Sequence, residues 1–225
     1  MSIARYLAER SGGILAAEPE ISEGGGDYQM FNAGGVECEV GEFLYGLVRM
    51  VKPERILETG THWGVSASFM GQALKENGHG KLTTIENQPY NVAKARALIE
   101  ALGLTQQVEI VPGDARAWEP GATRYDLILL DTELQFRFAD WVRLWPSLKE
   151  GGFLIVHDLH GHMNQTGIIA HGVLNGAYGV LPSKIEGLIR SHQVQSLHFE
   201  TPRGLYVGQK SAPDFHSTKL LTGHV

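Results

Sequence analysis

One stretch of the chain decides the fold, and it reads Arg55-Ile56-Leu57-Glu58-Thr59-Gly60-Thr61-His62-Trp63-Gly64. A short apolar run leads into a glycine turn, and a segment rich in small residues follows. Glycine lets a backbone turn tightly and approach a ligand closely. A helix that starts after such a turn offers free backbone N–H groups. The stretch therefore predicts a strand, a ligand-binding turn and a helix in that order.

Short apolar runs and helical stripes alternate from this point on, which is typical of a parallel sheet covered by helices. Predicted strands cover residues 55–58, 81–86, 108–112, 125–131, 152–157, 195–199 and 205–208. Predicted helices cover residues 3–10, 43–51, 65–77, 89–103, 138–148 and 164–176, and Pro146 kinks or ends the fifth of these. The pattern favours one α/β domain over two.

Composition narrows the class of protein further. The chain has 225 residues, of which 43% are apolar and 20% charged, and this excludes a disordered, collagen-like or coiled-coil protein. A net charge of −6 disfavours nucleic acid as a partner. The single cysteine, Cys38, fits a reducing compartment, and no run of 18 apolar residues predicts a membrane span. We therefore expect a cytoplasmic protein with no membrane partner.

Acidic residues follow several predicted strands, where an open parallel sheet binds its ligands. Glu86 stands where a carboxylate could accept both hydroxyls of a ribose, and Asp114 could bind an adenine amino group or cap the next helix. Asp131 is the last residue of the fourth predicted strand, and Asp158 follows the fifth. Two carboxylates that face each other require a metal ion, a shared proton or a cationic ligand.

A nicotinamide dinucleotide is disfavoured as the ligand. The dinucleotide fingerprint needs Gly-x-Gly-x-x-Gly, and His62 occupies the place of its second glycine. A nucleotide-dependent oxidoreductase nevertheless stays the alternative enzyme class.

Taken in register, these pieces resemble the class I S-adenosylmethionine-dependent methyltransferases, and within them the catechol O-methyltransferase-like group that acts on small molecules. The resemblance spans residues 41–210 and rests on five ordered segments, which are 55–61, 81–86, 111–115, 125–131 and 151–156. It implies a Rossmann-like, doubly wound sheet of seven strands, mostly parallel with an antiparallel last strand, and with helices on both faces.

The resemblance also implies how the cofactor S-adenosylmethionine would be held. Its methionine end would lie against the turn, its ribose near Glu86 and its adenine near Asp114. The implied cofactor-binding residues are Glu58, Gly60, Thr61, His62, Ser66, Glu86, Asn87, Asp114, Ala115 and Asp131.

The resemblance covers the site of a divalent ion only in part. Metal-dependent members bind Mg or Mn through positions that Asp131 and Asp158 match, but Leu159 replaces an asparagine ligand here. Leu134 stands where the usual lysine base would be. The requirement for a metal and the identity of the base therefore stay open.

Histidines near the fifth predicted strand could supply the missing base or the missing metal ligand. Four of them fall within fifteen residues, at His157, His160, His162 and His171. A histidine can accept a proton near neutral pH, and together with carboxylates it can hold Mn, Fe or Zn. We take Asp131, His157, Asp158 and His160 as the candidate catalytic residues.

The predicted organisation has three parts. Residues 1–52 form helices and a glycine-rich loop that could act as a cap or lid, residues 53–210 form the methyltransferase domain, and residues 211–225 form a tail. The predicted function is methylation of a hydroxyl on a small phenolic or sugar-bearing molecule. A cofactor-binding protein without turnover is the other alternative.

Methylation of nucleic-acid bases is disfavoured, because Asp131-Thr132-Glu133-Leu134 lacks the Pro-Pro-aromatic run of that class. Segments 20–38 and 160–183 are the expected walls of the acceptor site. The sequence leaves the oligomeric state open, although the amino-terminal segment and the tail could reach a second subunit.

Overall fold

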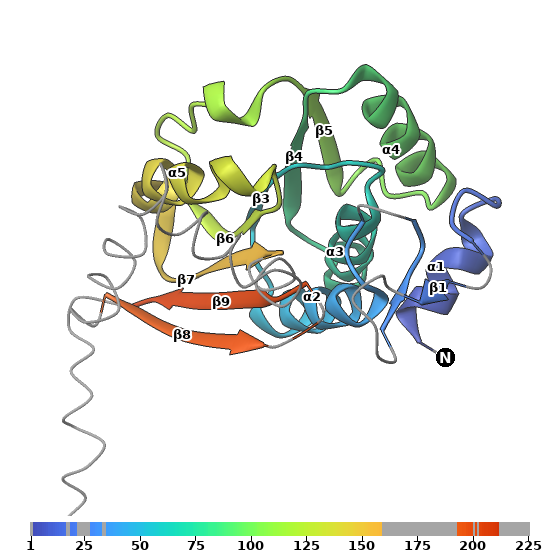
Figure 1. The fold of residues 1–225 in the computed structure, drawn as a ribbon, viewed down its shortest axis with the longest axis horizontal. Helices are drawn as coiled ribbons and strands as arrows, with labels where there is room; N and C mark the ends of the chain where they lie inside the picture. Colours follow the sequence, from blue (N-terminus) through green and yellow to red (C-terminus); the bar gives the residue numbers. More distant parts are fainter. Residues whose placement is uncertain are drawn as a thin grey trace, which may run out of the picture.

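A seven-stranded sheet forms the centre of the molecule (Figure 1), and its strand order is β5-β4-β3-β6-β7-β9-β8. The computed structural model describes residues 2–16, 19–21, 28–32, 35–158, 193–199, 201 and 203–211. The strands are β3 (Arg55–Thr59), β4 (Lys81–Glu86), β5 (Val108–Pro112), β6 (Tyr125–Leu130), β7 (Leu148–His157), β8 (Val194–Phe199) and β9 (Leu205–Lys210).

The strands β3 to β7 run parallel to one another, and β9 is antiparallel to both of its neighbours, β7 and β8. The first strand of the motif, β3, lies between β4 and β6. The chain order therefore reverses beside β3, and a ligand site is expected at such a switch point. This arrangement confirms the predicted doubly wound sheet with its antiparallel last strand.

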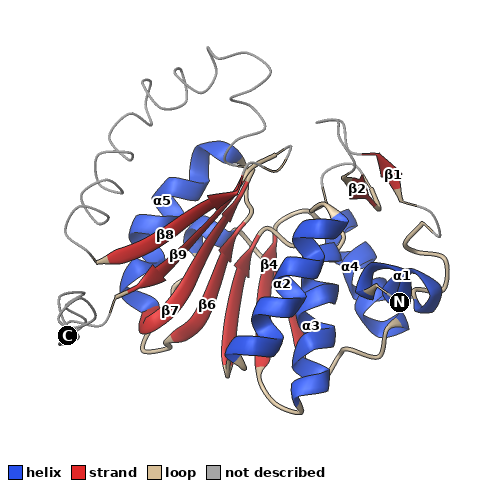
Figure 2. Ribbon diagram, turned by 90° about the horizontal axis from the view of Figure 1, so that it is seen from below, coloured by secondary structure: helices blue, strands red, loops and turns tan. Residues whose placement is uncertain are grey.

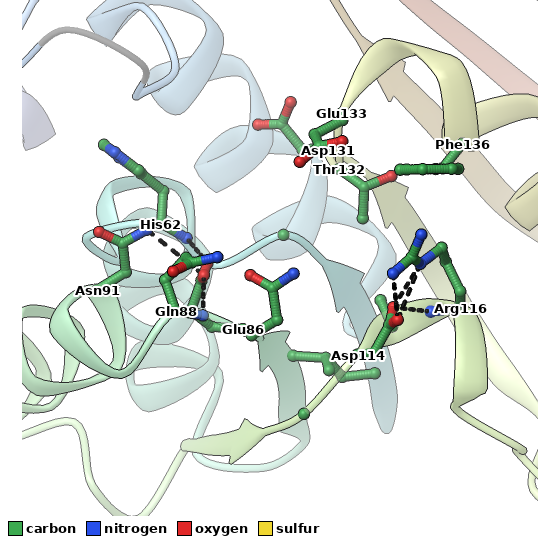
Figure 3. Close-up of a pocket in the computed structure, with 15 residues that line it drawn as sticks. His62, Glu86, Gln88, Asn91, Asp114, Arg116, Asp131, Thr132, Glu133 and Phe136 are labelled. Carbon is green, nitrogen blue, oxygen red and sulfur yellow. Dashed lines mark hydrogen bonds and ion pairs between the residues drawn. The ribbon is translucent and has the colours of Figure 1, made fainter.

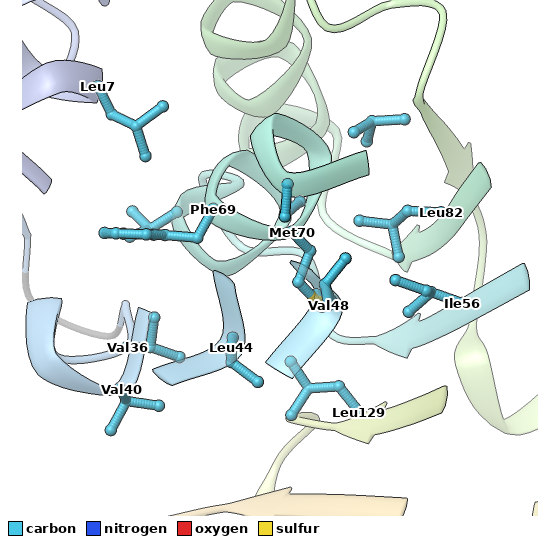
Figure 4. Close-up of a cluster of buried hydrophobic side chains, with 14 of the residues drawn as sticks. Leu7, Val36, Val40, Leu44, Val48, Ile56, Phe69, Met70, Leu82 and Leu129 are labelled. Atoms are coloured by element: carbon cyan, nitrogen blue, oxygen red, sulfur yellow. The ribbon is translucent and has the colours of Figure 1, made fainter. Parts of the chain in front are cut away.

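Helices cover both faces of the sheet (Figure 2) because residues along each strand alternate between two hydrophobic clusters. The larger cluster joins Ile56 and Leu129 to α1 (Ile3–Arg10), α2 (Cys38–Val51), α3 (Val65–Asn77) and α4 (Pro89–Ala101). Figure 4 shows the part of it between α2, α3 and the sheet. The smaller cluster joins Leu57 and Ile128 to Trp141 of α5 (Leu134–Leu144).

The helix α2 packs directly against α3. Gly41 makes this close approach possible, since a Cβ atom there would lie 2.4 Å from the ring of Phe69. The predicted segment 1–52 thus contributes to the same hydrophobic core as the sheet, through residues such as Leu7 and Leu44. Its separate role as a cap or lid stays a prediction.

Several predicted boundaries differ from the observed ones. The helix α2 begins at Cys38, five residues before the apolar stripe by which it was recognised. The helix predicted over residues 138–148 begins at Leu134 and ends at Leu144, because Pro146 lies in the 3-10 turn η2 (Trp145–Ser147). The chain re-enters the sheet at Leu148, before the predicted start at residue 152.

Short strands flank the glycine-rich run of the amino-terminal segment. The pair β1 (Glu20–Ile21) and β2 (Gln29–Met30) is antiparallel. The glycine run 23–27, the predicted helix 164–176 and the tail from residue 212 lie outside the described residues. Among the helices that the structure describes, none is long and apolar enough to cross a membrane.

Candidate active site

The turn after β3 is held in a left-handed backbone conformation at three positions. Gly60 has a φ of +90° and Gly64 one of +83°, and between them His62 has a φ of 48°. A Cβ atom at Gly60 would lie 2.2 Å from the carbonyl oxygen of Asp131, so glycine is required there. The backbone N–H groups of Gly60 and Thr61 both donate to the carbonyl of Ile85, which ties the turn to β4.

A buried polar network lies under this turn. Ser66 and Thr84 donate hydrogen bonds to the two carboxyl oxygens of Glu58, and the hydroxyl of Thr61 lies 2.6 Å from that of Thr84. All four side chains are buried. Burial raises the pKa of Glu58 to about 8, although its two hydrogen bonds oppose this shift. Glu58, Thr61 and Ser66 thus support the turn from below.

A pocket of about 360 Å³ opens at the carboxyl ends of the strands, and Figure 3 shows its lining. The tips of four neighbouring strands β3, β4, β5 and β6 meet there. It is lined by Gly60, His62, Ile85, Glu86, Asn87, Gln88, Asn91, Gly113, Asp114, Ala115, Arg116, Asp131, Thr132, Glu133 and Phe136. Seven of the predicted cofactor-binding residues are therefore brought together in one pocket of ligand size.

The carboxylate of Glu86 is fixed in position by backbone donors. The N–H groups of His62 and Gln88 each lie 2.8 Å from one of its oxygens. The side-chain amide of Asn91 lies 3.4 Å from one of the same oxygens. A carboxylate oriented in this way retains lone pairs for further donors, such as the two hydroxyls of a ribose.

At the other end of the pocket, Asp114 pairs with an arginine that the sequence analysis did not single out. The Arg116 guanidinium donates to both oxygens of Asp114, with the shortest distance at 2.5 Å. These hydrogen bonds hold the pKa of Asp114 below its usual range. The guanidinium also lies 4.4 Å from the centre of the Phe136 ring. Asp114 caps the 3-10 turn η1 (Ala115–Ala117) as well, which was the other role predicted for it.

Next to the pocket, the tips of β6 and β7 bring Asp131, His157 and Asp158 into one cluster. One ligand atom from each lies within 4.8 Å of the others. Nη2 of Arg137, on α5, lies between the two carboxylates, 3.1 Å from Oδ1 of Asp131 and 2.9 Å from Oδ2 of Asp158. The facing carboxylates thus have the cationic partner that their charges require.

His157 is enclosed by carboxylates from three parts of the chain. Its Nε2 lies 2.7 Å from Oε2 of Glu37, and its Nδ1 lies 3.2 Å from Oδ1 of Asp131 and 3.4 Å from Oδ1 of Asp158. Burial favours the neutral ring, but these negative charges and hydrogen bonds raise the pKa of His157 to about 9. Burial would likewise raise the pKa of Glu37, yet the hydrogen bond and charge of His157 bring it below its usual value.

These contacts do not favour His157 as the base, and its catalytic role stays a prediction. An imidazolium ion at neutral pH has no free lone pair to accept a proton, and the side chain is fully buried. The other preferred histidine, His160, lies outside the described residues, as do His162 and His171. The His157 ring instead holds Asp131 and Asp158 in place.

A second arginine completes the cluster. Arg203, in the turn between β8 and β9, approaches Asp158 with Nε at 2.5 Å and Nη2 at 2.7 Å, and it donates to the carbonyl of Gly35. Burial would raise the pKa of Asp158, but the charges of His157, Arg137 and Arg203 lower it to about 2. Asp158 is thus held as a carboxylate by three cationic side chains.

The donor set does not fit the predicted divalent ion. The spacing of Asp131, His157 and Asp158 alone would allow one. However, the position between the two carboxylates is filled by the Arg137 guanidinium, and a histidine ligand must be neutral to bind a metal. The arginines and the histidine already supply the positive charge that a metal would bring.

Sequence reasoning missed three members of this cluster. Glu37 precedes α2, Arg137 lies on a helix among apolar residues, and Arg203 follows a hairpin strand, so no local pattern sets them apart. One signal in the sequence did point to a cation here: Asp131 and Asp158 were expected to face each other, and two facing carboxylates need a positive partner.

Comparison with known proteins agrees with this geometry. The profile of a family described as "Methyltransferase domain" matches residues 57–159. A catechol O-methyltransferase from Niastella koreensis is 32% identical over 166 residues, which make up 70% of this chain and 72% of that relative.

Solved structures share the fold at lower sequence identity. A putative O-methyltransferase from Klebsiella pneumoniae gives a TM-score of 0.66 at 20% identity, over 94% of this chain and 91% of that one. An SAH-bound methyltransferase from Podospora anserina gives a TM-score of 0.65 at 18% identity, over 80% of this chain and 81% of that one.

The strand order and the pocket at the strand tips define a class I methyltransferase. The similarity over most of both sequences then places the chain more narrowly. It belongs to the catechol O-methyltransferase-like family of S-adenosylmethionine-dependent methyltransferases.

Proposed function

We propose that the chain methylates a hydroxyl group of a small molecule, with S-adenosylmethionine bound in the pocket at the tips of β3 to β6. The observation that carries this proposal is the convergence of Gly60, Glu86 and Asp114 on one pocket. These positions follow different strands, and in a class I methyltransferase they would meet the methionine, ribose and adenine parts of the cofactor.

Three features of the pocket suit this cofactor. The oriented Glu86 carboxylate can accept both ribose hydroxyls. Gly60 and Gly113 expose their backbone, and a Cβ atom at Gly113 would have no neighbour within 4 Å. Phe136 and Ala115 offer apolar surface to a flat base, with Asp114 at its edge. The cofactor, when bound, supplies a methyl group that is already electrophilic because it is attached to a positively charged sulfur.

The protein then has to align the acceptor oxygen with the methyl carbon and take up its proton. Methyl transfer would form a bond from the acceptor oxygen to the methyl carbon and break the bond from that carbon to sulfur, and the hydroxyl proton would pass to a base. We assign the role of this base to Asp131, which belongs both to the pocket and to the cluster. One of its oxygens, Oδ1, is held by Arg137 and His157, and the carboxylate thereby keeps a fixed orientation toward the pocket.

The acceptor class follows from the family. The relative from Niastella koreensis carries the name catechol O-methyltransferase, so catechol is the first acceptor to test, followed by other phenols and hydroxylated sugars. The predicted acceptor walls at residues 160–183 lie outside the described residues. A location in the cytoplasm stays a prediction.

Calorimetry with S-adenosylhomocysteine and with NAD tests the cofactor assignment. We expect the sulfur compound to bind and NAD not to. Glu86→Gln should weaken binding by about tenfold, because a carboxylate accepts stronger hydrogen bonds than an amide does. The matched control is Glu109→Gln, an exposed position on the neighbouring strand β5. Binding of NAD in preference to S-adenosylhomocysteine, or equal affinities in both variants, would overturn the assignment.

A further inference from the structure

We propose that the guanidinium group of Arg137 replaces the divalent ion of metal-dependent relatives, so that this chain orients its acceptor-facing carboxylate without a resident metal. The inference concerns the cluster of Asp131, Asp158, Arg137 and Arg203. It rests on the proposed function only where turnover is measured, since occupation of the site by an ion can be measured without any reaction.

The position of Arg137 is the first argument. A metal shared by Asp131 and Asp158 has to lie between one oxygen of each. Nη2 of Arg137 occupies that place, within 3.1 Å of both oxygens. The same nitrogen thus provides the two contacts that a bridging ion would provide.

The rigidity of Arg137 is the second argument. Its Nε donates to the carbonyl of Thr132 at 2.6 Å, and its Nη1 donates to the carbonyl of His157. All three guanidinium nitrogens are therefore engaged, and the side chain is only 6% exposed. An ion could enter only if these hydrogen bonds were broken and the guanidinium moved away.

The charge balance is the third argument. Arg137 and Arg203 bring two positive charges to the two aspartates, and Arg203 contacts both oxygens of Asp158. Metal sites work by the opposite arrangement, in which carboxylates carry excess negative charge until the ion binds. A divalent ion would here meet a pair of carboxylates that is already neutralised.

The consequence is a specific role for Arg137. A fixed cation beside Oδ1 of Asp131 sets the direction of this carboxylate, as a metal ion would. Arg137 is therefore a positioning residue. Unlike a metal ion, it contributes no open coordination position to the acceptor.

Mn²⁺ binding to chelator-treated protein tests the inference. Binding is measured as the loss of the electron paramagnetic resonance signal of free Mn²⁺. We expect the wild-type chain to bind no Mn²⁺ at this cluster up to millimolar concentration. Arg137→Ala should bind Mn²⁺ at least about tenfold more tightly, because it vacates the position between the carboxylates. The double variant Arg137→Ala with Asp131→Asn should lose that gain.

Arg143→Ala is the matched control, since it removes an arginine from the same helix that pairs with Asp140 instead. It should leave Mn²⁺ binding unchanged. Arg137→Gln, which keeps hydrogen-bond donors but no charge, serves if Arg137→Ala does not fold. Turnover of the wild type should be the same in chelator and in added Mn²⁺, whereas Mn²⁺ should raise the turnover of Arg137→Ala.

Two outcomes would overturn the inference. The first is Mn²⁺ binding by the wild type that Asp131→Asn abolishes. The second is the absence of any gain in both folded Arg137 variants. Failure of the proposed function would be seen separately, as an absence of S-adenosylhomocysteine binding.

Discussion

The two halves of the site are built in different ways. The pocket at the tips of β3 to β6 is open, and its ion pair joins two residues that are close in sequence, Arg116 and Asp114. The cluster at the tips of β6 and β7 is closed, and its contacts join residues as far apart as Glu37 and His157.

The two halves have different tasks in the proposed function: the open half binds the cofactor, and the closed half fixes the carboxylate of Asp131. Backbone turns and single carboxylates are enough to bind a cofactor that has hydrogen-bond donors of its own. A carboxylate that must keep one orientation needs contacts on several sides, and only segments from distant parts of the chain can supply them. We therefore expect substitutions in the open half to affect binding, and substitutions in the closed half to affect turnover and stability.

The sharpest test of this comparison is Asp131→Asn, because Asp131 belongs to both halves. The amide is nearly isosteric with the carboxylate but cannot take up the acceptor proton. We expect turnover to fall by about 10³- to 10⁴-fold, or about 4 to 5.5 kcal/mol of transition-state stabilisation, with S-adenosylhomocysteine affinity little changed. Single-turnover mass spectrometry and calorimetry measure the two quantities.

His62 is the alternative proton acceptor if Asp131 does not take up the proton. It lines the same pocket, and burial lowers its pKa, which favours the neutral ring that can accept a proton. Turnover that survives in Asp131→Asn but is lost in His62→Gln would assign the proton acceptor to His62 and would break the proposed division between the halves.

The same difference explains what the sequence could predict. Gly60 and Glu86 stand in short segments whose strand, turn and helix pattern can be recognised locally. The fold was therefore predicted correctly, and seven of the ten predicted cofactor-binding residues line one pocket. The closed half depends on side chains that meet only after folding. Glu37 precedes α2, and Arg203 lies in the turn between β8 and β9, yet both contact the β7 tip. Neither position carries a local pattern that announces such a contact.

The charge of His157 could not be predicted from the sequence for a related reason, and its catalytic role stays a prediction. Its place at a strand end beside Asp158 suggested a base near neutral pKa. Its pKa depends on how many carboxylates surround it, and two of the three, Asp131 and Glu37, reach it from distant parts of the sequence. The pKa of His157 could therefore not be inferred from the residues next to it in the sequence.

Removal of Glu37 should distinguish the halves by stability. Glu37→Ala leaves the buried His157 cation without its partner at 2.7 Å, and we expect it to lower the free energy of unfolding by about 3 to 5 kcal/mol. Asp114→Ala, in the open half, breaks an ion pair whose side chains are 38% and 51% exposed. It should cost about 1 kcal/mol or less. Urea unfolding at pH 7 measures both, and equal losses would contradict the contrast.

The pH dependence of stability offers a finer measurement of the closed half. The folded chain holds the His157 proton with a pKa of about 9, against 6.5 for an ordinary histidine. The stabilisation is therefore complete below about pH 6.5 and is lost as the pH rises through about 9, and it amounts to about 3 kcal/mol. Glu37, Asp131 and Asp158 are the charges responsible for it.

His157→Gln isolates this contribution, since it removes the titrating ring. Glu58, whose pKa burial raises to about 8, weakens the fold over an overlapping range of pH in both proteins. The informative quantity is therefore the difference between wild type and variant in how unfolding free energy changes from pH 6 to pH 10. We expect the wild type to lose about 3 kcal/mol more than the variant over this range. Parallel curves would mean that His157 is neutral when folded, and that the three carboxylates are balanced by the two arginines alone.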